Sequence, residues 1–232
     1  MTGRRLVDLS HPIEDGMVTY PGLPGPLVCD FFSREESRAL YGGMAEFVIS
    51  RVELVGNTGT YVDAPFHRVA DGIDVAALPL ERIAHVSGLV VRMRGAPRRA
   101  IGPEAFGGLD LAGRAVLVET GWSDHWRTER YLSGHPFLSA EAALVLRDGG
   151  AALVGIDSLN IDDMNDLARP VHTILLGAGI PVVEHLTGLG SVPDGDFRFT
   201  AAAAPIVGCG TFPVRAFAVV ERNLGGNNDA RR

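Results

Sequence analysis

The stretch SAEAALVLRDGGAALVGID, residues 139–157, decides the fold class. In its first half, apolar residues recur at helical spacing between Ser139, a suitable N-cap, and Gly149, a suitable C-cap. In its second half, residues 152–156 form an apolar run with the length of a buried strand. A helix followed directly by a buried strand is typical of proteins in which helices cover a sheet. The stretch therefore predicts the α/β class.

The alternation of helix and strand continues outward from this stretch. Residues 171–176 predict a short helix that ends at Gly177 or Gly179, and residues 180–183 predict a further strand. The other expected strands are apolar or β-branched runs at residues 6–9, 46–54, 86–93, 115–119 and 214–221. The later half of 46–54 alternates apolar and polar residues, so we expect a half-buried strand there.

The size and composition of the chain indicate one globular domain. The 232 residues are 46% hydrophobic and 21% charged, which is ordinary for a folded chain of this length. No internal repeat or low-complexity linker divides them. We therefore expect a single domain over residues 1–232, with a flexible polar tail at 223–232.

Charge and segment composition exclude several classes of protein. The net charge of -7 and the scattered arginines are not those of a nucleic-acid-binding surface. No secretory signal follows Met1, and no apolar run approaches the length of a membrane span, so we expect a cytoplasmic protein without a membrane or nucleic-acid partner. Cys29 and Cys209 are too few for a disulfide framework, and we expect reduced, structural thiols.

The first half of a candidate site is NTGTYVDAPFH, residues 57–67. Gly59 and Pro65 interrupt the segment, so we expect irregular backbone on which Asp63 and His67 converge. A divalent cation accepts such a mixed set of oxygen and nitrogen donors. The alternative is a local turn in which Asp63 caps backbone amides and His67 is solvated.

The second half of the candidate site is PVHTILLGAGIPVVE, residues 170–184. His172 is the strongly polar residue of an apolar helix, and Glu184 follows an apolar strand. Buried groups of both kinds need partners. In one alternative, His172 and Glu184 pair with each other in the core. In the other, both bind a metal together with Asp63 and His67. The spacing of the residues alone leaves both alternatives open.

Residues 57–67 resemble the signature His-x-Gly-Thr-His-x-Asp-x-Pro-x-His of the cyclase family that includes bacterial kynurenine formamidases and isatin hydrolases. The matching positions are Gly59, Thr60, Asp63, Pro65 and His67. Further landmarks follow the family order at residues 7–12, 20–22, 119–122, 155–158 and 172–184. The resemblance covers nearly the whole chain. It implies a swivelling β/β/α fold with mixed sheets and flanking helices, a homodimer or homotetramer, and zinc or manganese in the active site.

The resemblance also implies which residues hold a metal. Asp63, His67, His172 and Glu184 match one complete ligand set, whereas Asn57 and Tyr61 stand where the family has the two histidines of a second set. We therefore expect one divalent ion, zinc or manganese, per chain. Glu184 or His67 is then the candidate general base, and Tyr61 is a candidate hydrogen-bond donor.

The expected substrate is a small molecule. Tyr20, Asn57, Phe66 and Trp122 are the residues that we expect to line its pocket. The remaining histidines have no matched partner and are interpreted as surface or satisfied groups: His11, His85, His125, His135 and His185.

Three functions remain open from the sequence. The first is hydrolysis of a small amide, lactam or cyclic ester by metal-activated water. The second is a cyclase, lyase or isomerase that acts on a polyketide-like secondary metabolite. The third is a family member without catalysis. The intact ligand set favours hydrolysis.

Overall fold

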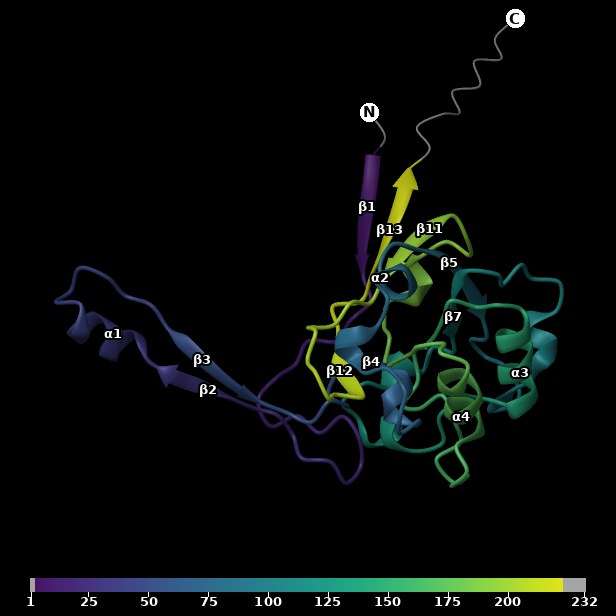
Figure 1. Cartoon of the computed structure of the whole chain (residues 1–232), viewed down its shortest axis with the longest axis horizontal. Coiled ribbons are helices and arrows are strands. Elements are labelled where there is room, and N and C mark those ends of the chain that lie inside the picture. Colours follow the sequence, from purple (N-terminus) through teal and green to yellow (C-terminus); the bar gives the residue numbers. More distant parts are fainter. Residues whose placement is uncertain (1–2, 223–232) are drawn as a thin grey trace, which may run out of the picture.

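A single mixed sheet organises the body of the molecule, and a long arm projects from it (Figure 1). The computed structural model describes residues 3–222. No helix among these residues is long and apolar enough to cross a bilayer. The tail predicted at residues 223–232 lies outside the described residues.

The sheet has nine strands with a parallel centre. β5, β7, β9 and β10 run parallel, and antiparallel strands extend the sheet on both sides. Their order is β1 (Gly3–Asp8), β13 (Phe217–Arg222), β11 (Phe197–Thr200), β5 (Val86–Arg92), β7 (Arg114–Glu119), β9 (Leu153–Ile156), β10 (Val182–Glu184), β4 (Tyr61–Asp63) and β12 (Thr211–Pro213). This mixed sheet with flanking helices confirms the predicted fold class.

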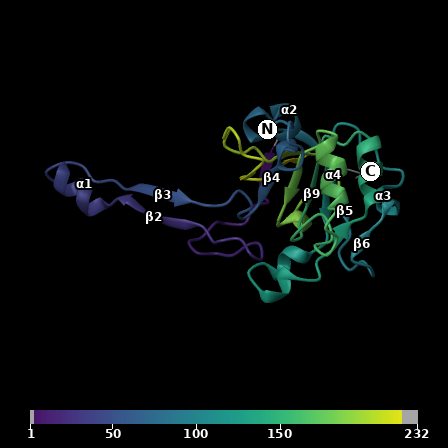
Figure 2. The same ribbon diagram turned by 60° about the horizontal axis from the view of Figure 1, so that its bottom comes forward.

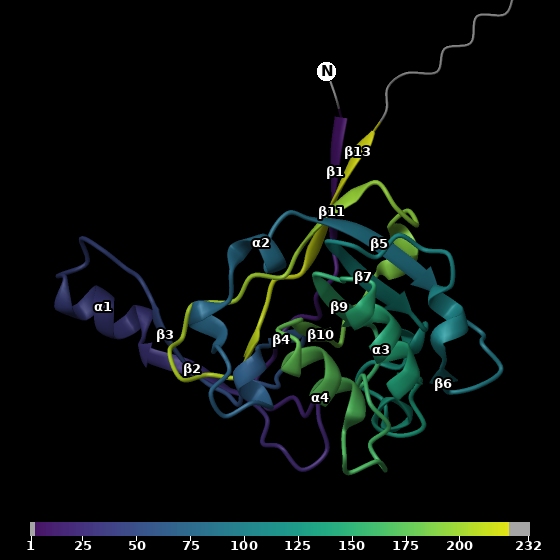
Figure 3. The same cartoon turned by 45° about the vertical axis from the view of Figure 1, so that its right-hand side comes forward.

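Both faces of the central strands are buried. Val116 and Val118 of β7 face a core shared with α3 (Ala140–Asp148) and α4 (Pro170–Gly177), which lie on one face of the sheet (Figure 3). Leu117, between them, faces a second core on the other side. Burial on two faces explains why the central strands are uninterrupted apolar runs in the sequence.

Shorter elements complete the body. They are α2 (Leu80–Ile83), the strand pair β6 (Ala100–Ile101) and β8 (Phe137–Leu138), and single 3-10 turns at Pro65–His67, Val75–Ala77, Pro103–Phe106, Trp122–His125, Glu129–Leu132 and Leu189–Ser191.

Most of the predicted elements are present. The helix predicted after Ser139 is α3, and the Ser139 hydroxyl accepts a hydrogen bond from Ala142 N as an N-cap does. The last strand was predicted too early: β13 begins at Phe217, and Val214 forms only an isolated bridge with Ala203. The three- and four-residue strands β4, β11 and β12 were not predicted.

The arm comprises β2 (Leu27–Phe32), α1 (Arg34–Leu40) and β3 (Ile49–Glu53), and it extends well away from the body (Figures 1 and 2). The expectation that residues 46–54 form a half-buried strand was wrong: every residue of β3 is exposed. Among the described residues, β3 pairs only with β2, and the residues of both strands are exposed apart from Phe32, so no second layer covers this sheet. Cys29 lies exposed on β2, so the expectation of a structural thiol was wrong there.

Close contact between β5 and β11 generates a stability prediction. Gly88 lies directly opposite Phe197, and a Cβ atom at Gly88 would lie 2.0 Å from Phe197 Cε2. Because Phe197 is itself buried, its ring has no free space to enter. We expect Gly88→Ala to lower the free energy of unfolding by about 1–3 kcal/mol in urea denaturation.

Gly177→Ala is the matched control, because a Cβ there meets no atom within 4 Å. We expect this variant to be at least as stable as the unmodified chain. Equal stability of the two variants would contradict the role given to the contact between Gly88 and Phe197.

Candidate metal centre

Strand register gathers the first residues of the site. β4 lies between β10 and β12, where Tyr61 is paired with Glu184, and Asp63 with Thr211. Because alternate residues of a strand point to one face, Tyr61 and Asp63 project toward the same side as these partners. The prediction of irregular backbone at Asp63 was wrong, since Asp63 is the last residue of β4. His67 follows on a 3-10 turn.

His172 enters the site from the first turn of α4. Asp162 accepts hydrogen bonds from His172 Nδ1 at 2.7 Å, from Val171 N at 2.7 Å and from His172 N at 3.1 Å. This carboxylate therefore caps the helix and orients the imidazole ring at the same time. The ring directs Nε2 toward Asp63 Oδ2 and Glu184 Oε1, each 3.6 Å away.

Asp63, His172 and Glu184 form a buried three-donor set whose ligand atoms lie within 4.8 Å of one another. Asp63 Oδ2 is buried, and no residue in the described part of the chain forms a hydrogen bond with it. His172 Nε2 and Glu184 Oε1 lie 3.6 Å apart, so the core bridge considered as the alternative is present as an ion pair of the protonated ring but not as a hydrogen bond. Two carboxylates and one imidazole, with an orphaned oxygen among them, fit a divalent cation.

His67 lies just outside this set, although it was predicted as a fourth ligand. Its Nδ1 is 3.8 Å from Asp63 Oδ1, and its ring centroid is 5.9 Å from that of His172. Thr211 Oγ1 lies 3.0 Å from His67 Nδ1 and donates to Asp63 Oδ1 at 2.5 Å. The side chain of His67 is 36% exposed, so the ring stands at the rim of the site.

The electrostatics of the site show an excess of buried carboxylates. Burial alone would lower the pKa of His172, but Glu184, Asp162 and Asp63 outweigh burial and raise that pKa to about 10. Burial raises the pKa of Glu184 to about 7. Burial opposes ionisation of Asp63, yet its two histidine neighbours and Thr211 lower its pKa. A proton on His172, or a cation in its place, is therefore strongly favoured.

Tyr61 is a neutral donor in this environment. Burial, followed by the charges of Glu184 and Asp63, raises the pKa of Tyr61 well above its ordinary value. Its hydroxyl donates to Glu184 Oε2 at 2.5 Å, while Glu184 Oε1 accepts from Ile161 N at 2.6 Å. Both oxygens of Glu184 are thus held in place.

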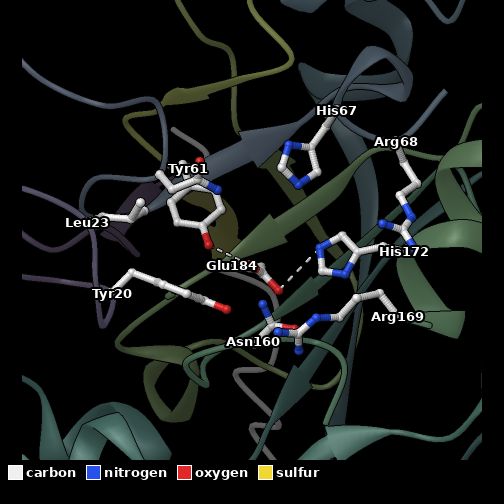
Figure 4. A pocket seen from close by; sticks show the side chains of 10 residues that line it. Tyr20, Leu23, Tyr61, His67, Arg68, Asn160, Arg169, His172 and Glu184 are labelled. Atoms are coloured by element: carbon white, nitrogen blue, oxygen red, sulfur yellow. Dashed lines mark hydrogen bonds and ion pairs between the residues drawn. The ribbon is translucent and has the colours of Figure 1, made fainter. Parts of the chain in front are cut away.

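The donor set opens into a pocket of about 280 Å³ (Figure 4). Tyr20 and Asn57 are among its lining residues. Phe66 and Trp122 are not: Phe66 lines an adjoining pocket that shares Asn57 and His67 with this one, and the indole of Trp122 donates to Tyr131 O at 3.0 Å. The lining residues that the sequence did not suggest are Leu23, Arg68, Asn160 and Arg169.

The interpretation of the unmatched histidines was wrong for two of them. His185 is fully buried and neither of its ring nitrogens has a partner among the described residues. Burial lowers its pKa to about 3, so the ring is neutral. His11 stacks on Trp126 at 3.9 Å, and the same part of the chain offers no partner for its Nε2. His135 is partly satisfied, because its Nε2 lies 3.0 Å from Asp162 O.

Asp162 and Thr211 were missed from the sequence. Asp162 lies six residues beyond Ile156, the last residue of β9, and no local pattern marks it as a partner of His172. Thr211 gave no signal either, since its place beside Asp63 depends on pairing between β12 and β4.

Known proteins match this chain over nearly its whole length. The family model described as "Putative cyclase" matches residues 7–163. The chain is 30% identical over 218 residues to a kynurenine formamidase of Bacillus cereus, covering 90% of this chain and 95% of that protein. It is 28% identical over 223 residues to a kynurenine formamidase of Bacillus anthracis, with coverages of 93% and 98%.

Solved structures match as well. A potential metal-dependent hydrolase with cyclase activity is 26% identical, with a TM-score of 0.77 and coverages of 95% of this chain and 100% of that chain. Isatin hydrolase A from Labrenzia aggregata is 21% identical, with a TM-score of 0.81 and 94% of each chain covered. The second match shows a shared fold.

The pKa of His172 predicts proton release on metal binding. Without a cation this pKa is about 10, so zinc must displace a proton from the ring. We expect zinc affinity to rise about tenfold per pH unit between about pH 7 and pH 9, with about one proton released at about pH 8.5. Calorimetry in buffers of different ionisation enthalpy measures the release.

The pKa of His172 in the metal-free fold lies above the ordinary histidine value of 6.5. Proton binding therefore stabilises the metal-free fold below about pH 6.5, and this contribution is lost as the pH rises toward about 10. Asp162→Asn removes one of the carboxylates that raise the pKa of His172, so the number of protons released per bound zinc ion near pH 8.5 should be smaller. Zinc binding without proton release in the unmodified chain would contradict the prediction.

Proposed function

Since the chain belongs to the Putative cyclase family, we propose that it is a metal-dependent hydrolase of a small amide, with lactams and cyclic esters as related substrates. The observation that carries this proposal is the buried set of Asp63, His172 and Glu184, in which Asp63 Oδ2 has no hydrogen-bond partner among the described residues while His172 and Glu184 line a substrate-sized pocket. Relatives named kynurenine formamidase support an amide as the bond that is cleaved.

We propose one divalent ion, zinc or manganese, per chain, held by Asp63, His172 and Glu184. Three protein ligands with an open position are the usual arrangement of a catalytic zinc. When bound, the ion polarises a carbonyl group and makes water more acidic. The neutral residues Asn57 and Tyr61 replace the imidazoles of the second ligand set, and Tyr61 is already bonded to Glu184.

His67 is the favoured general base of the two that we considered. The Thr211 hydroxyl has one hydrogen and donates it to Asp63 Oδ1, so it must accept from His67 Nδ1. Neutral His67 then carries its proton on Nδ1 and a free lone pair on Nε2. This nitrogen takes a proton from water as water attacks the carbonyl carbon, and it returns the proton to the leaving nitrogen.

Tyr61 and Glu184 act through position and polarity in this proposal. The raised pKa keeps the Tyr61 hydroxyl protonated, so it serves as a donor to oxygen. Tyr20 and Asn57 line the pocket beside it, and we propose that they contact the substrate.

A second candidate function is cyclisation or isomerisation of a secondary metabolite. It is supported by the similar structure described as a metal-dependent hydrolase with cyclase activity. Incorporation of ¹⁸O from labelled water into the product separates the two functions, because only hydrolysis requires it.

We also propose that the chain forms a homodimer or homotetramer through its arm. Phe31 is 73% exposed, Leu40 71% and Met44 90%, and all three lie between the start of β2 and the start of β3. Exposed apolar side chains gathered on one element mark an interaction surface. An isolated two-stranded sheet is marginally stable in water, so a partner surface would also stabilise the arm.

The function is tested with metal-free protein that is reloaded with zinc or manganese. We expect about one ion per chain by elemental analysis, and hydrolysis of N-formylkynurenine or isatin that is lost on chelation and restored on reloading. Activity that resists chelation would contradict the proposed function. Two tightly bound ions per chain would contradict the single-ion centre.

Matched variants separate the roles within the same assay. His67→Gln and Tyr61→Phe should each keep the ion, and the loss of the base in His67→Gln should lower kcat about a hundredfold or more. Asp63→Asn should lose the ion and the activity together. Unchanged turnover of His67→Gln would exclude His67 as the base.

The oligomer is tested by light scattering at micromolar concentration. Met44→Glu places a charge on the arm and should shift the protein toward monomers, because a buried unpaired charge opposes association. Val207→Glu is the control, since Val207 is 83% exposed and lies outside the arm. A monomeric unmodified chain would contradict the proposal.

A further inference from the structure

Two arginines on the wall of the pocket have no acidic partner. Arg68 donates to Ala168 O at 2.7 Å and to Thr173 Oγ1 at 3.1 Å, and Arg169 donates to Asp163 O at 2.9 Å. These acceptors are neutral. By contrast, Arg92 and Arg215 form ion pairs with carboxylates at 2.6 Å. Within residues 3–222, neither pocket arginine forms an ion pair of this kind.

Arg169 is held in an unusual backbone conformation. Its φ of 48° and ψ of 58° lie in the left-handed region, which favours glycine and asparagine and is costly for a long side chain. Such residues gather at functional sites, where surrounding contacts enforce them. The side chain makes no capping bond to α4, a role that Asp162 fills instead.

The guanidinium of Arg169 extends into the pocket (Figure 4). It lies beside Asn160 and near the hydroxyl of Tyr20. Arg169 is only partly exposed, so its charge is partly removed from water and lacks a counterion. A ligand that carries an anion would supply one.

The charges of the pocket favour an anion at this position. The carboxylates of Asp63 and Glu184 face His172, where a divalent ion would balance their two negative charges. The other lining residues, including Tyr20, Leu23 and Asn57, are uncharged. The two arginines are therefore the permanent cations of the lining.

We propose that Arg169, assisted by Arg68, binds a carboxylate of the substrate, so that the chain acts on small amides that carry a carboxylate. The planar guanidinium matches a carboxylate with two parallel hydrogen bonds. The aromatic rings of Tyr20 and Tyr61 and the aliphatic side chain of Leu23 offer an apolar wall for an aromatic substrate. The choice of amides rests on the proposed function, whereas anion binding does not.

The test compares benzoate with benzamide, its neutral isostere, by calorimetry on zinc-loaded protein. We expect benzoate to bind roughly tenfold or more tightly, and Arg169→Asn to remove most of this preference. Asparagine suits the left-handed backbone, so thermal unfolding of the variant should be unchanged. Arg169→Lys restores the charge and should restore part of the preference.

Arg198→Gln is the matched control, because it removes an exposed charge on β11 that is not part of the pocket lining. Its preference for benzoate should equal that of the unmodified chain. Equal affinity for both probes in the unmodified chain would overturn the proposal. A preference that survives Arg169→Asn, with zinc content unchanged, would assign the carboxylate to the metal instead and overturn it too.

Kinetics on 2-formamidobenzoate and formanilide separate this inference from the proposed function. Arg169→Asn should lower kcat/KM for the anionic amide roughly tenfold more than for the neutral amide, chiefly through a higher KM. If neither amide is cleaved but benzoate binding depends on Arg169, the hydrolase is wrong and the anion site stands. If both are cleaved equally well with and without Arg169, the hydrolase stands and the anion site is wrong.

Discussion

The interaction on which the site depends is the burial of His172 among three carboxylates. Asp63 comes from β4, Glu184 from β10 and Asp162 from the segment after β9, so the imidazole joins three separate parts of the chain. Buried carboxylates are costly unless a positive charge or hydrogen bonds compensate them. The fold therefore holds these elements together only if a proton or a cation occupies the space between them.

Asp162 couples this requirement to the secondary structure. Its oxygens accept hydrogen bonds from the first amides of α4 and from the ring of His172. The same carboxylate therefore fixes both the position of the helix and the orientation of the ring. On the opposite side, Thr211 ties β12 to Asp63 and to His67. Hydrogen bonds to a ligand from outside the donor set fix its tautomer and direction. The centre is consequently rigid on both sides while its mouth remains open.

Local sequence patterns predicted the parts of this structure that depend on near neighbours. Apolar spacing and capping residues identified α3, β7, β9 and α4, because those elements are buried by ordinary helix and sheet packing. The family signature identified Asp63, His172 and Glu184, which the structure brings together. Trp122 was assigned to the pocket because it lies in one of the family segments of the sequence. In the structure it does not line the pocket, and its indole donates to Tyr131 O.

The missed features depend on distant contacts. The alternation in residues 46–54 suits a half-buried strand, yet burial requires a second layer, and the arm has none within the described chain. β4, β11 and β12 are too short to show periodicity, and their register is set by strands that are far away in the sequence. Arg169 looks like an ordinary charged residue before a proline, and only the fold directs it into the pocket.

The loss of the second ligand set and the presence of unpaired arginines are physically connected. A second divalent ion would add positive charge beside the substrate, whereas Asn57 and Tyr61 contribute only neutral dipoles. The hydroxyl of Tyr61 instead donates a hydrogen bond to Glu184 Oε2. The proposed pocket with one ion has less positive charge to attract an anionic substrate, and the partly buried guanidinium of Arg169 compensates for it at a fixed position. In this pocket, positive charge that a second ion would supply is carried instead by the pocket wall. A charge on the wall can distinguish substrates without altering the geometry of the metal ligands.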